Sequence, residues 1–258
     1  MPNLKREFLN GGIYHAFNRG VEKRNIFMNE SDYYRFIFSL YECNDAVSVR
    51  VTQRIINRRA RNLSRSVARF HLATLDRVVD DSKLKSYKRE LLVDILGFVL
   101  MPNHYHLILR QLAEGGISLF MKKMSNSYTG YFNDHYKRKG VGALFQGAFK
   151  AVPVAGEGQL MHLVEYVFSN PVEIIDPDWK NRGTENPKEA LNFLKTYKWS
   201  SYLDSVGIDN FPSVTAREFL WKIFGDNKGI ESGKQKIKKS VQEWVENKRF
   251  LNPKLTLE

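Results

Sequence analysis

Residues 92–110 read LVDILGFVLMPNHYHLILR, two apolar stretches separated by a short turn. The first stretch, 92–100, is rich in apolar and β-branched residues and predicts a strand. Met101-Pro102-Asn103 turns the chain, and 104–110 predicts the next strand. Strands joined by so short a turn pair antiparallel, so this stretch predicts a β-hairpin.

The regions around this hairpin predict one further strand before it and one after it, with helices between them. The order is strand, helix, insertion, strand, strand, helix, strand, helix. We therefore expect an α+β fold: a ferredoxin-like antiparallel sheet with helices packed on it, a helical insertion at about 45–90 and C-terminal helices. The outer strands are predicted at 13–19 and 145–154, and the helices from Ser31, at 117–137, at 159–170, from a Thr215-x-x-Glu218 capping box to Phe224, and at 231–246.

The 258-residue chain is strongly basic. Its net charge is +12 and its pI is about 9.6, which suggests an anionic partner, most often nucleic acid, although a basic surface can also simply face solvent. The one cysteine, Cys43, excludes a disulfide framework or a cysteine-rich zinc site and fits a reducing cytosol. The polar N-terminus predicts no signal peptide, and the longest apolar run, 91–101, falls short of a membrane span.

A separate basic block lies within the predicted insertion. Residues 46–75 contain seven arginines and no acidic residue. Six of the arginines are spaced by three or four residues, which on a helix makes one cationic stripe. The stripe predicts either an arm that contacts phosphates or a solvated helix face. Its members are Arg50, Arg54, Arg58, Arg61, Arg65 and Arg69.

His104 and His106 alternate on the second strand of the hairpin, so both project from one face of the sheet. Two imidazoles side by side on a rigid strand can share a divalent cation. The same spacing also fits the alternative that one histidine is simply a core residue. His15, on the first predicted strand, could approach the same site, lie in the core or contact DNA.

The predicted helix 159–170 carries Tyr166 and Asn170 one turn apart on one face. A tyrosine on an apolar stripe usually belongs to the core, but a tyrosine and an amide aligned in this way can also face a site. An amide oxygen suits a hard cation such as Mg²⁺ or Mn²⁺. A phenol, with a pKa of about 10, can attack a phosphodiester that is polarised by a metal held by His104, His106 and Asn170. The product would be a covalent phosphotyrosine.

Together, PNHYHLIL (102–109) and EYVFSNPV (165–172) resemble the REP-associated tyrosine transposases. These are bacterial members of the HUH class of single-tyrosine transposases, named for histidine, a bulky hydrophobic residue and histidine. The resemblance covers most of the chain except about 45–90. Flanking stretches that are also similar to the family are HAFNRGVEKRNIF (15–27), SDYYRFIFSL (31–40), 131–151, YKWSSY (197–202) and FLWKIFG (219–225).

The resemblance implies an endonuclease and strand transferase that acts on single-stranded DNA next to a hairpin. Tyr166 would be the nucleophile, forming a 5′-phosphotyrosine and releasing a free 3′-OH, and His104, His106 and Asn170 would hold Mg²⁺ or Mn²⁺. It also implies a bacterial, cytoplasmic and nucleoid-associated protein, either monomer or dimer. We expect a catalytic domain at 1–204 and a C-terminal helical extension at 205–258.

Several polar and basic residues are candidate DNA contacts, with a turn at a strand end or a solvated surface as the alternative. In LFQGAFKA (144–151), Ala148 stands where many relatives carry arginine, and Lys150 can substitute for the lost phosphate contact. The candidate contacts are Asn18, Arg19, Arg54, Arg58, Arg61, Arg65, Lys122, Lys137, Arg138 and Lys150.

Other functions stay open on the sequence alone. A non-catalytic nucleic-acid-binding protein with a ferredoxin-like sheet explains the charge and the fold equally well, but not the spacing of the histidines, the tyrosine and the asparagine. A metal-dependent hydrolase fares worse, because no acidic ligands flank the histidine pair. Tyr128, near basic residues on the preceding helix, is an alternative nucleophile that lacks a partner asparagine.

Overall fold

The structure, a computed structural model, describes residues 7–46, 89–138, 140, 142–226 and 228–247. Most of the predicted insertion, including the arginine stripe, therefore lies outside the described residues. The chain divides into two compact units. Among the described residues, the first unit comprises 7–11, 29–46, 89–94, 111–138 and 140, and the second comprises 12–28, 95–110, 142–226 and 228–247.

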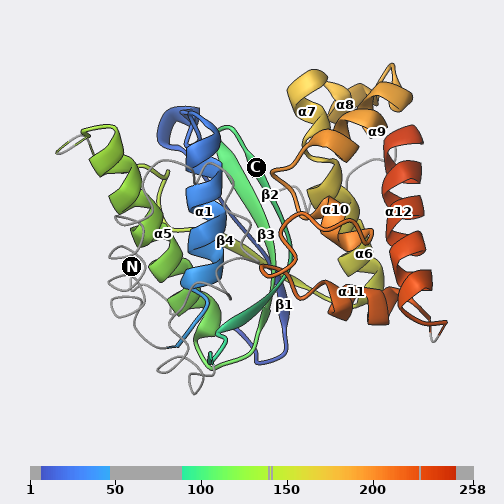
Figure 1. Ribbon diagram of the computed structural model, residues 1–258, viewed down its shortest axis with the longest axis horizontal. Helices are drawn as coiled ribbons and strands as arrows, with labels where there is room; N and C mark the ends of the chain where they lie inside the picture. The colour runs from blue at the N-terminus through green and yellow to red at the C-terminus, as the bar shows by residue number, and fades with distance from the viewer. Residues whose placement is uncertain (1–6, 47–88, 139, 141, 227, 248–258) are drawn as a thin grey trace. The chain divides into compact units, whose positions relative to one another are not determined.

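The described elements begin in the order β1, α1, β2, β3, α5, β4, which is the order of a ferredoxin-like fold. The four strands form one sheet in the order β2-β3-β1-β4, and β1 pairs antiparallel with both β3 and β4 (Figure 1). The predicted α+β fold and antiparallel sheet are thus confirmed. These elements are β1 (Ile13–Arg19), α1 (Glu30–Glu42), β2 (Val93–Met101), β3 (His104–Gln111), α5 (Gly116–His135) and β4 (Lys150–Val154).

The register of β1 decides which side chains meet on the sheet. Phe17 lies opposite His106 of β3, and Arg19 lies opposite His104. Along its other edge, β1 places Phe17 opposite Lys150 of β4. Residues directly opposite each other in antiparallel strands point to the same side of a sheet. The register therefore gathers both histidines and two cationic residues on one face.

The turn between β2 and β3 is held by the segment that follows β1. The carbonyls of Pro102 and Asn103 accept hydrogen bonds from Ile26 N and Gly20 N, each at 2.8 Å. Gly20 has no room for a side chain, because a Cβ there would lie 2.2 Å from the Arg24 carbonyl oxygen. The short 3-10 helix η1, which spans Val21–Lys23, begins directly after this glycine.

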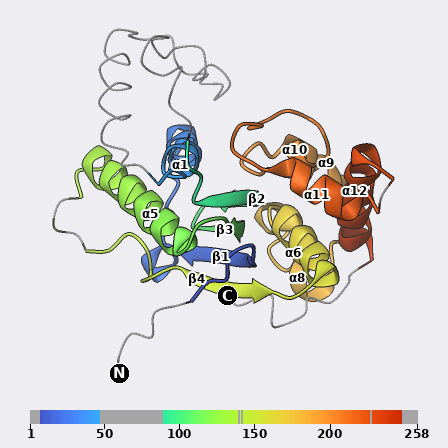
Figure 2. The ribbon, with the colours of Figure 1, turned by 90° about the horizontal axis from the view of Figure 1, so that it is seen from below.

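Helix α6, which spans Glu157–Ser169, runs along the face of the sheet that carries the histidines (Figure 2). Its apolar residue Leu163 shares a core with Ile108 of β3 and Leu96 of β2. Tyr202 and Leu220, on either side of the expected boundary at 204 and 205, belong to the same core. The other helices of the second unit are α7 (Val172–Ile175), α8 (Trp179–Arg182), α9 (Pro187–Thr196), α10 (Tyr202–Ser205), α11 (Arg217–Phe224) and α12 (Ile230–Glu246).

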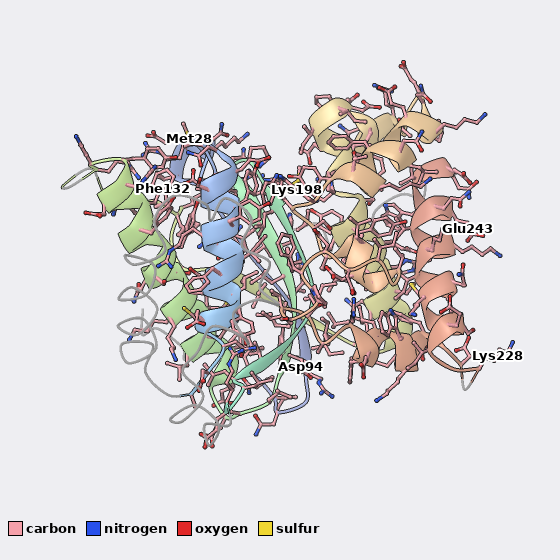
Figure 3. The ribbon with its side chains drawn as sticks, in the orientation of Figure 1. Met28, Asp94, Phe132, Lys198, Lys228 and Glu243 are labelled. Atoms are coloured by element: carbon pink, nitrogen blue, oxygen red, sulfur yellow. The ribbon has the colours of Figure 1, made fainter. Side chains whose placement is uncertain are left out.

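Helix α12 is amphipathic. Its buried residues Val241 and Trp244 belong to the core that contains α6. Its residue Glu243 points outward (Figure 3). Lys239 Nζ lies 3.6 Å from Glu243 Oε1. None of the helices in the described part of the chain has the length and apolar character to cross a bilayer.

The YKWSSY stretch covers the outer edge of β2. Leu100 N donates to the Trp199 carbonyl at 2.9 Å, and Ser201 N donates to the Phe98 carbonyl at 3.0 Å. Ser201 Oγ also accepts from Phe98 N at 2.8 Å. These bonds satisfy backbone groups that would otherwise form an exposed sheet edge.

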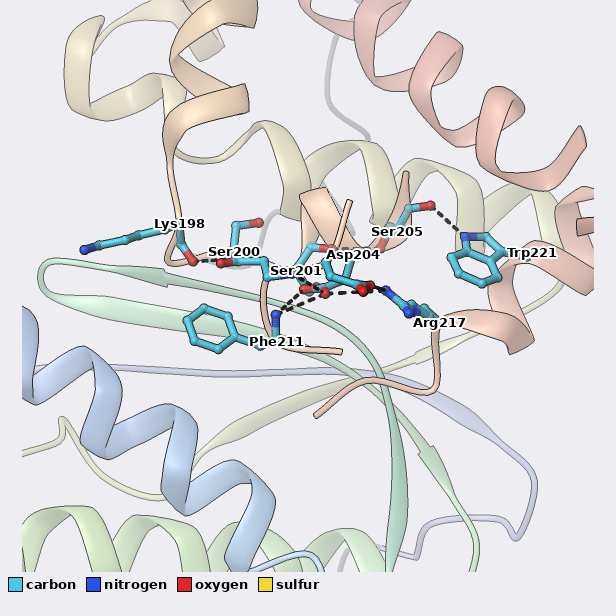
Figure 4. A network of polar contacts seen from close by, with 10 residues as sticks. Lys198, Ser200, Ser201, Asp204, Ser205, Phe211, Arg217 and Trp221 are labelled. Atoms are coloured by element: carbon cyan, nitrogen blue, oxygen red, sulfur yellow. Dashed lines mark hydrogen bonds and ion pairs between the residues drawn. The ribbon is translucent and has the colours of Figure 1, made fainter. Parts of the chain in front are cut away.

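A buried carboxylate fixes the chain that follows this stretch (Figure 4). Asp204 accepts hydrogen bonds from the backbone N–H groups of Asn210 at 2.9 Å and Phe211 at 3.0 Å, and its Oδ1 lies 3.7 Å from Arg217 Nη1. Burial raises the pKa of Asp204, while the two backbone donors and Arg217 act in the opposite direction. Trp221 Nε1 donates to the Ser205 carbonyl at 2.7 Å, which attaches α11 to the same turn.

In the first unit, α1 and α5 run side by side (Figures 1 and 2). A capping box starts α1, because the Asn29 side chain accepts from Asp32 N and the Asp32 carboxylate accepts from Asn29 N. The buried carboxylate of Asp32 also accepts from Tyr131 Oη at 3.0 Å and Tyr136 Oη at 2.8 Å, both from the end of α5 or just beyond it. The helix thus begins one residue before the predicted Ser31.

Two local predictions are wrong. The strand predicted from residue 145 begins only at Lys150, because Gly147 has a φ of 147° that interrupts the extended backbone. The Thr215 capping box does not form: Ala216 is the N-cap of α11 without a side-chain cap bond, and Thr215 Oγ1 is buried without a hydrogen-bond partner.

The structure also contains α9, which the sequence patterns do not predict. It begins after Asn186, whose Oδ1 accepts from Glu189 N at 3.2 Å, and Pro187 stands in its first turn. Both are typical helix-start signals.

Gly97 lets α6 approach β2 closely. A Cβ at this position would lie 3.2 Å from the Phe168 ring and 3.4 Å from Ile108 Cδ1. We expect Gly97→Ala to lower the free energy of unfolding by about 1–3 kcal/mol, because buried side chains must shift to make room. Urea unfolding followed by circular dichroism measures this.

Gly130→Ala is the matched control. Gly130 lies exposed in α5, and a Cβ there would meet nothing within 4 Å. Removing a glycine from a helix interior should raise the free energy of unfolding by about 0.5–1 kcal/mol. A Gly97→Ala protein as stable as the wild type would contradict the close packing between α6 and the sheet.

Candidate active site

The two histidines of β3 lie side by side on a buried part of the sheet. Their side chains project from the same face, as the alternation predicts, and their ring centroids are 5.0 Å apart. His104 is 6% exposed and His106 is 1% exposed. Tyr105, between them in sequence, instead packs edge-on against Phe145, with ring centroids 5.8 Å apart.

Hydrogen bonds orient His104 and fix its tautomer. His104 Nδ1 lies 2.6 Å from Asn103 Oδ1, and Asn103 Nδ2 donates to the Lys23 carbonyl at 3.3 Å, which orients the amide. An amide oxygen can only accept, so the proton of the neutral imidazole sits on Nδ1. The Nε2 atom of His104 is left with a lone pair, the form that binds metals.

His106 is oriented by a third histidine. His106 Nδ1 lies 2.9 Å from His15 Nε2 of β1, and the two rings stack with centroids 5.0 Å apart. His106 Nε2 is buried without a hydrogen-bond partner. If His106 Nδ1–H donates to His15, the Nε2 atom of His106 carries a lone pair. A buried polar atom without a hydrogen-bond partner usually marks a bound ion or a functional role.

Asn170 completes the polar side of the site. It caps the end of α6 and is fully buried, with Oδ1 3.4 Å from His104 Nε2 and Nδ2 without a hydrogen-bond partner. Two acceptors that face each other at this distance repel, and a bound cation would turn this repulsion into attraction. The donor set of two imidazole nitrogens and one amide oxygen therefore fits a divalent metal.

Tyr166 of α6 lies against the histidines, as the proposed chemistry requires. Its ring is edge-on to His106, with centroids 5.3 Å apart, and to His15, with centroids 5.9 Å apart. The side chain is 2% exposed. Lys180 Nζ, from α8, lies 5.3 Å from the centroid of the same ring. His162, one turn earlier, is instead half-exposed and pairs with Glu165 at 3.0 Å.

His15 and His106 are held neutral. Burial lowers the pKa of His15 from 6.5 to about 3. Burial also lowers the pKa of His106 well below its ordinary value, and the nearby charges of His104, His15, Lys180 and Arg19 lower it further, in that order. Neutral imidazole is the form that ligates metals. Within the described residues, no group of three or more His, Cys, Asp or Glu side chains is placed to hold one ion, so a third ligand would come from an amide such as Asn170.

A pocket of about 220 Å³ opens beside the histidines. Three of the predicted DNA contacts, Asn18, Arg19 and Lys150, line it. Asn18 Nδ2 donates to the Gly147 carbonyl at 3.0 Å, and Lys150 Nζ lies 5.9 Å from the centroid of the Phe17 ring. The remaining lining residues are Phe17, His104, Tyr105, His106, Gln146 and Ala148.

The other predicted DNA contacts do not line this pocket. Lys122 lies exposed on α5, while Lys137 and Arg138 follow that helix in the first unit. Lys137 has a φ of 53°, and Arg138 N donates to the Asn133 carbonyl at 2.7 Å. Four further candidates lie outside the described residues: Arg54, Arg58, Arg61 and Arg65.

Sequence reasoning missed Lys180 and left the place of His15 open. Lys180 stands in DPDWKNR (176–182), a polar stretch without a recognisable motif. His15 carried a weak signal, since it lies on a strand of the same sheet, but only the register of β1 against β3 brings it to His106.

Comparison with known proteins finds a match between part of the chain and a family model. The family model described as "Transposase IS200 like" matches residues 51–170, a range that contains both histidines, Tyr166 and Asn170. The match begins within the stretch at about 45–90 that carries no motif resemblance. This match covers less than half of the chain, and it supports the resemblance to transposases that the motifs predict.

Two solved structures are similar to the chain at low identity. One is a REP-associated tyrosine transposase bound to a REP hairpin, 14% identical over 84% of this chain and 92% of that chain, with a TM-score of 0.45. Another is the tRNA(His) guanylyltransferase from Saccharomyces cerevisiae, 13% identical over 97% of this chain and 84% of that chain, with a TM-score of 0.30. No curated protein matches the chain. Similarities at this level do not assign a function by themselves.

The neutral buried histidines make stability depend on pH. The unfolded chain binds a proton at His15 below about pH 6.5, whereas the folded chain does so only near pH 3. The free energy of unfolding should therefore rise as the pH is raised from about 3 to 6.5, by up to about 1.4 kcal/mol per pH unit for each such histidine. Urea titrations of the metal-free protein across this range measure the slope.

Two variants assign the slope. His15→Gln removes one titrating ring but keeps an acceptor for His106. It should therefore make the free energy of unfolding depend less steeply on pH, leaving only the contribution of His106. His135→Gln, at an exposed position on α5, should leave the slope unchanged. An equal slope in the His15→Gln and wild-type proteins would show that His15 does not couple protonation to folding.

Proposed function

We propose that this protein is a single-stranded DNA endonuclease and strand transferase in which Tyr166 attacks a phosphodiester next to a hairpin. The observation that carries the proposal is the contact between the Tyr166 ring and His106, with centroids 5.3 Å apart, beside a buried nitrogen of His106 that has no hydrogen-bond partner. The relation to IS200-like transposases supports a DNA substrate and a transposase reaction.

The proposed step is a transesterification. Tyr166 Oη forms a bond to phosphorus, and the bond from phosphorus to the 3′ oxygen of the DNA breaks. The phenol proton passes to water, and the released 3′ oxygen takes up a proton from water. One ester replaces another, so the 5′-phosphotyrosine retains the bond energy for the reverse step, and strand joining requires no ATP.

His104, His106 and Asn170 would hold Mg²⁺ or Mn²⁺. When bound, such an ion supplies Lewis-acid polarisation of the phosphate. The protein supplies the orientation, since Asn103 and His15 hold the Nδ1 sides of the two imidazoles and so direct both Nε2 atoms to the site. Because Tyr166 meets the histidines within one chain, we propose that the nucleophile acts in cis, with a monomer sufficient for cleavage.

The DNA would enter by the pocket beside the histidines. Arg19 and Lys150, with the polar side chains of Asn18 and Gln146, offer phosphate contacts on its walls. We propose that four residues of the arginine stripe, Arg54, Arg58, Arg61 and Arg65, contact the DNA backbone elsewhere, together with Lys122, Lys137 and Arg138. A protein with this role would act at the bacterial nucleoid.

Trapping the covalent intermediate tests the function. Single-stranded DNA with a hairpin and randomised flanks, labelled at its 3′ end, is incubated with the full chain and Mn²⁺ and then denatured. The label should migrate with the protein, because the tyrosine keeps the 3′ fragment, and Tyr166→Phe should abolish the adduct.

Three control results separate the alternatives. Tyr128→Phe should keep the adduct, since Tyr128 is fully buried in the first unit and burial raises its pKa. Cleavage without an adduct would identify a hydrolase. Binding without either would favour a non-catalytic nucleic-acid-binding protein.

Ala148 offers a gain-of-function test of the pocket. It is exposed at the pocket wall, where the resemblance to the REP-associated tyrosine transposases implies an arginine in many members of that family. We expect Ala148→Arg to tighten binding of hairpin DNA about threefold to tenfold at moderate salt and to steepen the dependence of log affinity on log salt by about one unit.

Lys150→Gln should do the reverse in the same assay, weakening binding and reducing the salt slope, because it removes a cation from the same wall. Lys222→Gln, on α11, is a charge-matched control that should leave the slope of the wild type. Unchanged affinity and slope in both pocket variants would exclude this pocket as the path of the DNA.

A further inference from the structure

Lys180 lies beside Tyr166, the proposed nucleophile. Its Nζ lies 5.3 Å from the centroid of the Tyr166 ring, and its side chain is only 15% exposed. Lysine side chains are seldom this buried without a specific partner, because burial of the ammonium costs solvation free energy. Neither the motifs nor the pocket lining account for this lysine.

The surrounding chain holds Lys180 in this position. Glu173 Oε2, on α7, lies 2.6 Å from Lys180 Nζ and forms an ion pair with it. Trp179 anchors α8 in the core at 6% exposure, and Arg182 at the end of α8 pairs with Asp176 at 2.7 Å. A short helix with these attachments can present one ammonium at a fixed place.

The charge of Lys180 reaches the histidines. Lys180 and Arg19 both help to lower the pKa of His106, after burial and the neighbouring histidines. The two cations come from different elements, since Arg19 ends β1 and Lys180 lies on α8. Positive charges from two elements therefore act on the point where Tyr166 meets His106.

Attack on a phosphodiester calls for such charges. Negative charge stays on the non-bridging oxygens of the phosphate while the attacking and leaving oxygens share the phosphorus, and lysine ammonium groups bind phosphate oxygens as point charges. A donor aimed at charge in the transition state commonly contributes a hundredfold or more in rate, on the order of the effect of an oxyanion-hole donor.

We propose that Lys180 is a further catalytic residue, whose ammonium binds a non-bridging oxygen of the scissile phosphate while Tyr166 attacks and keeps that contact in the phosphotyrosine. The inference rests on the proposed function. Glu173 is its positioning residue, holding the ammonium beside the Tyr166 ring before DNA arrives. Lys180 keeps its proton throughout, and the transesterification is balanced by water as described above.

The test compares the full-length wild type with Lys180→Met, Lys180→Arg and Lys188→Met in the adduct assay. Lys188, exposed on α9, is the matched control. Adduct formation should slow about 100-fold in Lys180→Met, recover most of the way in Lys180→Arg and stay at the wild-type rate in Lys188→Met. Mn²⁺ affinity, measured by electron paramagnetic resonance, should be unchanged in all of them.

A second substrate separates phosphate binding from a structural role. One methylphosphonate at the scissile position removes the charge of a non-bridging oxygen. With this substrate, the rates of wild type and Lys180→Met should differ by less than about threefold, because the partner of the ammonium is gone. If Lys180→Met lowers the melting temperature, Lys180→Gln takes its place in both comparisons.

The outcomes are distinct. The same rate difference on both substrates, or none on the natural phosphodiester, would overturn the role of Lys180 while the adduct upholds the proposed function. Loss of Mn²⁺ affinity in Lys180→Met would show instead that Lys180 has a structural role in maintaining the metal site. No adduct in the wild type would overturn both proposals.

Discussion

The hydrogen bond between His15 Nε2 and His106 Nδ1 is the interaction on which the candidate site depends. It joins β1 to β3 through side chains as well as backbone, and both rings are almost completely buried. Burial favours the neutral form of an imidazole, because a charge is costly away from water. In neutral His106, Nδ1 is paired with His15 and Nε2 has no hydrogen-bond partner. Two buried rings of the sheet thus serve to orient one nitrogen atom, His106 Nε2.

The rest of the site is supplied by packing rather than by polar contacts. Helix α6 lies on the histidine face because its apolar side chains share a core with β2 and β3, and Gly97 lets that helix come close. Tyr166 reaches His106 as one more member of the same core. If Tyr166 is the nucleophile, as proposed, packing positions it before substrate arrives, which lowers the entropic cost of attack.

The sequence predicts the features that depend on local periodicity, and fewer of those that depend on distant partners. Strand alternation correctly places His104 and His106 on one face, and the hairpin and α6 follow from apolar patterns and a short turn. The bond from His15 to His106 needs the register of strands 91 residues apart, which no local pattern encodes. Lys180 reaches Tyr166 through two short helices of polar sequence. The capping-box motif at Thr215 does not form, because the helix starts one residue later and Ala216 is its N-cap.

The corner between α6 and α7 has a mechanical consequence. Asn170 is the C-cap of α6 and Pro171 is the N-cap of α7, and Glu173, which pairs with Lys180, is the second residue of α7. The phenol, the amide and the carboxylate that anchors the ammonium are therefore carried by eight consecutive residues, 166–173. Local unfolding of this corner would displace the three groups together, so this part of the candidate site is ordered or lost as one cooperative unit.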